Sequence, residues 1–136
     1  MNSMCVEFSA ISTNEAFARL CVSSFLLPLD PKISDITDIK TAVSEAVTNA
    51  IIHGYENKEG MVKIKCLVRD RQVEIIICDQ GRGIDDIEKA RKPLYTSKPQ
   101  QERSGMGFTV MEAFMDTVEI TSELNVGTTI KMTKKL

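Results

Sequence analysis

The sequence predicts a two-layer α/β sandwich of the α+β type, built from about five strands and three principal helices. Segments with period-two alternation indicate strands, and segments with apolar residues at helical spacing indicate amphipathic helices. The two kinds of segment are interleaved without the strict βαβ order of a dinucleotide-binding fold. With 136 residues, 43% hydrophobic and 26% charged, the chain is expected to form one compact domain over 1–136.

The chain is predicted to begin with a strand at 5–10, followed by a helix at 15–27. The strand shows alternation, and the helix has an amphipathic pattern. Ser12 and Glu15 have the spacing of a capping box, in which each side chain satisfies a backbone N–H group of the first turn. Pro28 is expected to end the helix.

A second helix is predicted from Ser34, as its N-cap, to about His53, with Gly54 ending it. Glu45, Asn49 and His53 recur every fourth residue on one face. Such a stripe is usually solvated, but a carboxylate one turn from an amide oxygen also suits a general base beside a Mg²⁺ ligand. The helix alone leaves both interpretations open. The opposite face carries an apolar core stripe of Ile36, Ile39, Val43, Ala46, Val47, Ala50 and Ile51.

Four more strands are predicted in the second half of the chain. Residues 61–69 alternate, whereas 73–79 is more continuously apolar, as in the interior of a sheet. The remaining predicted elements are a helical stretch at 87–91, a helix at 108–114, and a hairpin of 118–123 with 128–132.

Composition argues against several classes of protein. A net charge of −2 argues against nucleic acid as the main partner. No apolar run reaches the length of a membrane span, and the N-terminus lacks the pattern of a signal peptide. With one histidine and no C-x-x-C pair, a zinc site is not expected. Three of the four cysteines are interpreted as small buried hydrophobes in a reducing cytoplasm; the four are Cys5, Cys21, Cys66 and Cys78.

Two glycine-containing segments carry the strongest chemical signals. Asp79, Gly81 and Gly83 form a D-x-G-x-G pattern directly after a buried strand. The acid could accept a hydrogen bond from an exocyclic amine, and the glycines let the backbone approach a ligand, although D-x-G also makes ordinary turns. Residues 103–108 (RSGMGF) open a helix, where exposed N–H groups suit a phosphate. This segment is neither a Walker A loop nor a dinucleotide-binding fingerprint.

In this order and spacing, the motifs resemble the ATP-binding domain shared by gyrase, Hsp90, histidine kinases and MutL, known as the GHKL superfamily or Bergerat fold. Residues 45–50 resemble its N box, 79–83 and 104–108 its two glycine boxes, and 127–129 its closing G-T strand. The resemblance runs from about residue 10 to the end. It implies a mixed, mostly antiparallel sheet of about five strands, covered on one face by about three helices.

The size of the chain favours the stand-alone members of that superfamily. Sensor histidine kinases need a separate helical domain, and gyrase, Hsp90 and MutL need a transducer domain, for which 136 residues leave no room. Residues 45–55 and 103–112 closely resemble the anti-sigma F factors of endospore-forming bacteria, which are protein serine kinases.

The resemblance implies a role for each motif residue. Glu45 would be the general base, and Asn49 would coordinate the Mg²⁺ of Mg·ATP. Asp79 would bind the adenine amino group, with either Thr128 or Thr129 assisting through water. The other implied nucleotide contacts are glycines and cations of the two boxes and of a lid over 93–103, where Arg103 replaces a glycine usual in histidine kinases; they are Gly81, Gly83, Lys98, Arg103, Ser104, Gly105 and Gly107.

The implied activity is an ATP-dependent switch. The protein would hold a sporulation sigma factor (sigma F) of RNA polymerase inactive, and would phosphorylate a serine of an anti-anti-sigma antagonist. Partner contacts are expected on the first helix around Arg19, whose pattern also fits an ordinary surface arginine. A homodimer without membrane or direct nucleic-acid contacts is expected. Alternatives are an anti-sigma kinase of the general stress response, an ATP-hydrolysing switch without a protein substrate, and a binding module with an inactive site.

Overall fold

The computed structural model describes residues 1–92 and 107–136, which form a five-stranded sheet flanked by helices. The strand order is β1-β2-β3-β5-β4, and every pairing among the described residues is antiparallel. This architecture confirms the predicted α+β sandwich of five strands, but the described sheet is antiparallel throughout and not mixed as the resemblance implied. The strands are β1 (Asn2–Ser9), β2 (Met61–Arg69), β3 (Gln72–Asp79), β4 (Thr117–Glu123) and β5 (Gly127–Lys135).

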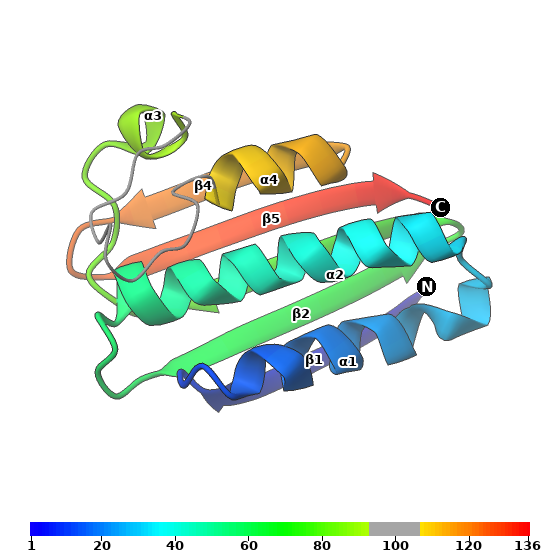
Figure 1. Ribbon diagram of the computed structural model, residues 1–136, viewed down its shortest axis with the longest axis horizontal. Helices are drawn as coiled ribbons and strands as arrows, with labels where there is room; N and C mark the ends of the chain where they lie inside the picture. The colour runs from blue at the N-terminus through cyan, green and yellow to red at the C-terminus, as the bar shows by residue number, and fades with distance from the viewer. Residues whose placement is uncertain (93–106) are drawn as a thin grey trace.

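Three principal helices cover one face of this sheet, with α2 in the middle between α1 and α4 (Figure 1). In the described part of the chain, no helix is both long and apolar enough to cross a lipid bilayer. The helices are α1 (Asn14–Leu26), α2 (Ile33–Thr48), α3 (Ile87–Ala90) and α4 (Gly107–Phe114), with a 3₁₀ turn η1 (Leu27–Leu29) after α1 and a π-helix η2 (Asn49–Gly54) after α2.

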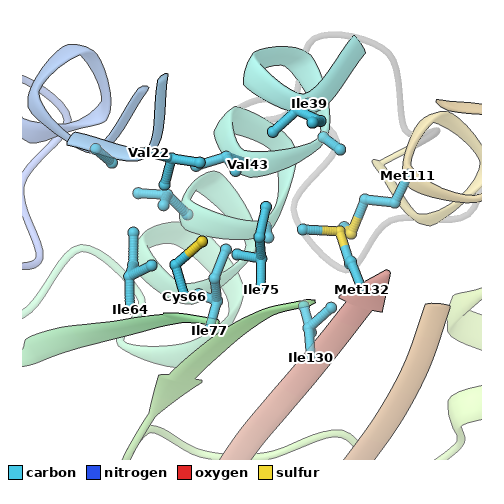
Figure 2. Packing of buried hydrophobic residues seen from close by; sticks show 14 of the residues in the cluster. Val22, Ile39, Val43, Ile64, Cys66, Ile75, Ile77, Met111, Ile130 and Met132 are labelled. Carbon is cyan, nitrogen blue, oxygen red and sulfur yellow. The ribbon is translucent and has the colours of Figure 1, made fainter. Parts of the chain in front are cut away.

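The core lies between α2 and the centre of the sheet (Figure 2). Alternate residues of β2 and β3 point into it, which is the pattern that predicted these strands. Each large apolar side chain fully buried here contributes roughly 1.5 to 3 kcal/mol. The labelled core residues, all 2% exposed or less, are Val22, Ile39, Val43, Ile64, Cys66, Ile75, Ile77, Met111, Ile130 and Met132.

The other face of the sheet is open and charged, as antiparallel sheets allow. Lys63 and Lys65 of β2 are exposed there. On the same face, the Nζ atom of Lys131 lies 2.9 Å from a carboxylate oxygen of Glu74. The sheet therefore separates an apolar interior from a solvated outer surface.

The predicted capping box at the start of α1 is wrong. The helix begins at Asn14, and no side chain caps it. The Glu15 carboxylate instead accepts hydrogen bonds from two hydroxyls of α2, that of Thr48 at 2.7 Å and that of Ser44 at 3.3 Å. A contact between helices thus replaces the local one.

The predicted N-cap of α2 is also wrong. The helix begins at Ile33, so Ser34 is already inside it. The N-cap is Lys32, where the backbone is still extended, and its side chain makes no capping bond. The helix therefore starts two residues earlier than a serine cap requires.

Only one of the four cysteines is a buried hydrophobe, so the prediction for three is wrong. Cys66 lies in the core, and burial raises the pKa of its thiol to about 12. Cys21 and Cys78 are half-buried, and Cys5 is exposed. Cys78 alternates with buried residues of β3 and so faces the open side of the sheet.

Candidate functional site

The central helix widens over its last six residues. The π-helix η2 continues α2 from Asn49 to Gly54, and the Tyr55 N–H donates to the Ala50 carbonyl at 2.9 Å, five residues back. Single π turns inside helices are frequent at functional sites. The predicted helix to about His53 is confirmed in extent. Its every-fourth-residue spacing does not continue beyond Asn49, because the π turn is wider than an α turn.

Three polar side chains are buried in the described residues, and all three are predicted nucleotide contacts. Asn49 and Asp79 are each 8% exposed, and Thr128 is 3% exposed. Asp79 ends β3 and lies directly opposite Thr128 of β5 in the sheet register. The π-helix that begins at Asn49 contacts both of these strands. Buried polar groups therefore gather at one end of an otherwise apolar interior.

Figure 1 shows the layout of this end of the molecule. The C-terminal end of α2, the turn between β4 and β5, and helix α3 all lie at the left of the view, away from the marked chain termini. Glu45, one turn before Asn49 on α2, is half-buried. The predicted general base and the predicted metal ligand therefore lie on consecutive turns of the same helix.

Two opposing effects act on the ionisation of the Asp79 carboxyl group. Burial raises the pKa of its carboxyl group, and hydrogen bonds from the backbone of Gly81 and Thr128 partly oppose that rise. The Gly81 N–H donates to Asp79 Oδ1 at 2.9 Å. A carboxylate has about four acceptor positions, so capacity remains for a ligand amine.

Gly81 lets the D-x-G-x-G loop pack against the end of η2. A Cβ atom at this position would lie 2.2 Å from the Gly54 carbonyl oxygen, a distance that real structures do not tolerate. The same carbonyl accepts a hydrogen bond from the Arg82 N–H at 2.8 Å. The family resemblance implied that Gly81 contacts the nucleotide. The structure shows in addition that Gly81 permits a close approach between two backbone segments.

Gly83 fits the loop to the turn between β4 and β5. It has a φ of +77°, and a Cβ atom there would lie 2.3 Å from the Glu123 carbonyl oxygen. On the same side, the Ser122 hydroxyl accepts the N–H of Ile84 at 2.7 Å. The loop is therefore held between η2 on one side and the hairpin on the other.

The sheet register distinguishes the two candidate threonines. Thr128 Oγ1 lies 2.8 Å from the Ser122 hydroxyl, beside Asp79. Thr129 faces the open side of the sheet, where its hydroxyl donates to Cys78 Sγ at 3.6 Å. Thr129 is thus not beside the acid. Ser122 carries no signal in the sequence, because its position becomes informative only through its pairing with Thr128 in the hairpin.

Of the remaining predicted contacts, the structure describes Gly107 and Arg19. Gly107 is the first residue of α4 and is half-buried. On α1, Arg19 Nη1 donates to the Ser44 hydroxyl of α2 at 3.0 Å, immediately before Glu45 in the chain. The predicted lid over 93–103 and four predicted contacts lie outside the described residues; these contacts are Lys98, Arg103, Ser104 and Gly105.

Solved structures support the fold assigned from this geometry. The RsbU and RsbW domains of a Mycobacterium tuberculosis protein align with a TM-score of 0.71 at 22% identity, covering 100% of this chain and 32% of that one. The catalytic domain of histidine kinase ThkA aligns with a TM-score of 0.61 at 18% identity, covering 97% and 95% of the two chains. At these sequence identities, the two matches show similarity of fold alone.

Sequence comparison is more specific. Residues 9–134 match the family described as the histidine kinase-like ATPase domain. The anti-sigma F factor of Clostridium kluyveri is 58% identical over 98% of this chain and 94% of its own length. That of Bacillus subtilis strain 168 is 59% identical over 99% and 93%. The chain therefore belongs to the anti-sigma F factor family, within the histidine kinase-like ATPase domains.

Proposed function

We propose that the protein is an ATP-dependent anti-sigma factor and protein serine kinase. It would hold a sporulation sigma factor inactive in the cytoplasm and phosphorylate a serine of an anti-anti-sigma antagonist. One observation carries the proposal in a chain of this family: Asp79 and Thr128 are buried opposite each other in the sheet, and the π-helix that begins at the buried Asn49 contacts both of their strands.

On the adenine side, we assign recognition to Asp79. Its carboxylate would accept a hydrogen bond from the exocyclic amine, and Thr128 would assist through a bridging water. The burial of both side chains supports this assignment, because a hydrogen bond gains specificity where bulk water is excluded. Gly81 and Gly83 would keep the loop close enough to the ring for that contact.

On the phosphate side, we assign Mg²⁺ to Asn49. Mg²⁺ in nucleotide sites takes one or two protein oxygens and fills its octahedron with phosphates and water, so one buried amide oxygen fits the ion. When bound, the ion would neutralise the charge that develops on the phosphates during transfer. Gly107 at the start of α4 would face the phosphates. Four residues would join it there: Lys98, Arg103, Ser104 and Gly105.

Glu45 would act as the general base of the transfer. Its carboxylate takes the proton of the attacking serine hydroxyl. The serine oxygen forms a bond to the γ-phosphorus, and the bond from that phosphorus to the β–γ bridging oxygen breaks, which releases ADP. The position of Glu45 one turn before Asn49 supports this role, because base and metal-bound phosphate must be neighbours.

For partner binding, we propose the exposed face of α1. Leu20 is 62% exposed and Phe17 is 44% exposed, and Arg19 lies between them in the chain. The hydrogen bond from Arg19 to Ser44 supports a link between this surface and the helix that carries Glu45. A homodimer is also proposed, from the family resemblance, and sedimentation analysis would test it.

The deciding experiment incubates the protein with Mg·ATP and a dephosphorylated anti-anti-sigma protein, and reads intact mass and free phosphate. We expect one phosphate on the partner. Glu45→Gln should lower the transfer rate by about 10² to 10⁴ while nucleotide still binds. The matched control is Glu59→Gln, in an exposed loop, which should transfer normally. Free phosphate with an unmodified partner would instead identify an ATP-hydrolysing switch.

A further inference from the structure

Tyr55 links three parts of the chain through its side chain. Its hydroxyl accepts a hydrogen bond from the Gln80 N–H at 2.7 Å and donates one to the Met61 carbonyl at 2.6 Å. The ring lies against Gly60, where a Cβ atom would fall 2.4 Å from Tyr55 Cε1. The hydroxyl thus uses both its donor and its acceptor capacity, and the ring has little room to turn.

These contacts fall at the point where the loop after Asp79 begins. Strand β3 ends at Asp79, so the sheet no longer supplies acceptors to the N–H groups that follow. The Gln80 N–H bonds to the Tyr55 hydroxyl, and the Arg82 N–H bonds to the Gly54 carbonyl. The two acceptors are consecutive residues: Gly54 is the last residue of η2, and Tyr55 is the residue that follows it. The end of the central helix therefore sets the path of the loop.

We propose that Tyr55 is a positioning residue for nucleotide recognition, and the inference rests on the proposed role of Asp79 in binding adenine. By fixing the main chain at Gln80, the hydroxyl orients the neighbouring carboxylate. Gln80 is exposed, so water can replace the lost hydrogen bond and the fold should survive without it. The effect should fall on the base that Asp79 binds and not on the phosphates.

The test compares ATP with inosine triphosphate, which has an oxygen in place of the adenine amino group. Calorimetric titration would give both dissociation constants for the wild type and for Tyr55→Phe. We expect Tyr55→Phe to weaken ATP binding about twofold to tenfold, the range of one hydrogen bond, and to leave inosine triphosphate nearly unchanged. The ratio of the inosine triphosphate dissociation constant to the ATP dissociation constant should therefore decrease by the same factor. Thr117→Val is the matched control, because it removes a hydroxyl contact, with Thr133, at the start of β4.

A second measurement follows the loop without any ligand. Amide hydrogen exchange at Gln80 should be faster in Tyr55→Phe than in the wild type, and unchanged in Thr117→Val. Gly60→Ala supplies an independent variant, because it keeps the hydroxyl but pushes on the ring. It should produce the same two effects as Tyr55→Phe.

The outcomes distinguish the proposed role of Asp79 in adenine binding from the positioning role of Tyr55. If the wild type binds both nucleotides equally, the assignment of Asp79 to adenine fails, and the role of Tyr55 fails with it. If the wild type prefers ATP but Tyr55→Phe keeps the full preference, only the positioning role is overturned. Unchanged exchange at Gln80 would also overturn it.

Discussion

The middle and one end of the same helix–sheet sandwich differ in what they bury. In the middle, Ile39 and Ile75 are fully enclosed by other apolar side chains. At the end, Asn49, Asp79 and Thr128 are almost as deeply buried but polar. Burial of apolar side chains in the middle stabilises the folded state, whereas burial of polar side chains at the end costs desolvation free energy. The comparison teaches that the stability of the fold and the capacity to bind come from different parts of one interior.

The largest effect on stability is expected from a substitution in the apolar middle of the core. Ile75→Ala removes a fully buried side chain and should lower the free energy of unfolding by about 2 to 5 kcal/mol, from lost burial and the cavity left behind. Urea denaturation would measure it. Ile76→Ala, on the half-exposed opposite face, is the control and should cost less. Equal losses would mean that the two faces of β3 do not differ as described.

At the polar end, Asp79→Asn should act on binding and not on stability. Loss of a charge-assisted hydrogen bond should weaken ATP binding about tenfold or more. The fold should be as stable as the wild type or more stable at neutral pH, because burial of the charged form is relieved. Calorimetry and thermal unfolding would measure the two quantities. Asp85→Asn, exposed, should change neither.

Comparison with Asp79→Asn also predicts how the unfolding free energy of the wild type depends on pH. The folded-state pKa of Asp79 lies above its ordinary value of 3.8, so between the two values the folded protein binds more protons than the unfolded chain. The unfolding free energy of the wild type, relative to Asp79→Asn, should therefore fall as pH rises from 3.8 through the raised pKa, and then stay constant. A difference that grew in favour of the wild type with rising pH would contradict burial as the main cause.

The contact between the loop after Asp79 and the end of η2 should affect both stability and nucleotide binding. Gly81→Ala places a Cβ atom 2.2 Å from the Gly54 carbonyl oxygen, so one backbone segment must move. We expect a loss of about 1 to 3 kcal/mol in stability, together with weaker ATP binding. Gln80→Ala, at the exposed neighbouring position, should spare both properties. Wild-type behaviour of Gly81→Ala would argue against close packing of the loop on η2.

The smallest expected effect separates the two threonines. Thr128→Val removes the hydroxyl beside Asp79 and should weaken ATP binding by about the twofold to tenfold of one hydrogen bond. Thr129→Val alters only the open face and should leave ATP binding unchanged. Fluorescence titration with a labelled nucleotide would compare them. A larger effect from Thr129→Val would reverse their assignment.

Much of the fold followed from local pattern. Alternation over 61–69 and the apolar run over 73–79 located β2 and β3 to within one residue. The core stripe of α2 was also correct at Ile39, Val43 and Val47. These signals are reliable because one face of each element meets the same apolar interior, so periodicity encodes burial directly.

The side-chain roles that could not be predicted from the sequence have a common physical cause. Glu15 had the spacing of a cap, but its carboxylate bonds to hydroxyls on a different helix. Tyr55 had no local signal, because the N–H group that bonds to its hydroxyl belongs to Gln80, which is distant in the sequence. The ambiguity between Thr128 and Thr129 required the strand register. Side chains whose partners are set by tertiary structure cannot be assigned from spacing alone.

The pairing of β3 with β5 has a consequence for the kinetics of folding. Asp79 and Thr128 are opposite each other in the sheet but about fifty residues apart in the sequence. Long-range strand pairing is slow to form, because the entropy of closing the intervening chain is lost before the contacts are gained. A chain in which only the local β2–β3 hairpin has formed would carry Asp79 without its partner. Nucleotide binding should therefore report the long-range pairing of β3 with β5, and not the formation of the local β2–β3 hairpin.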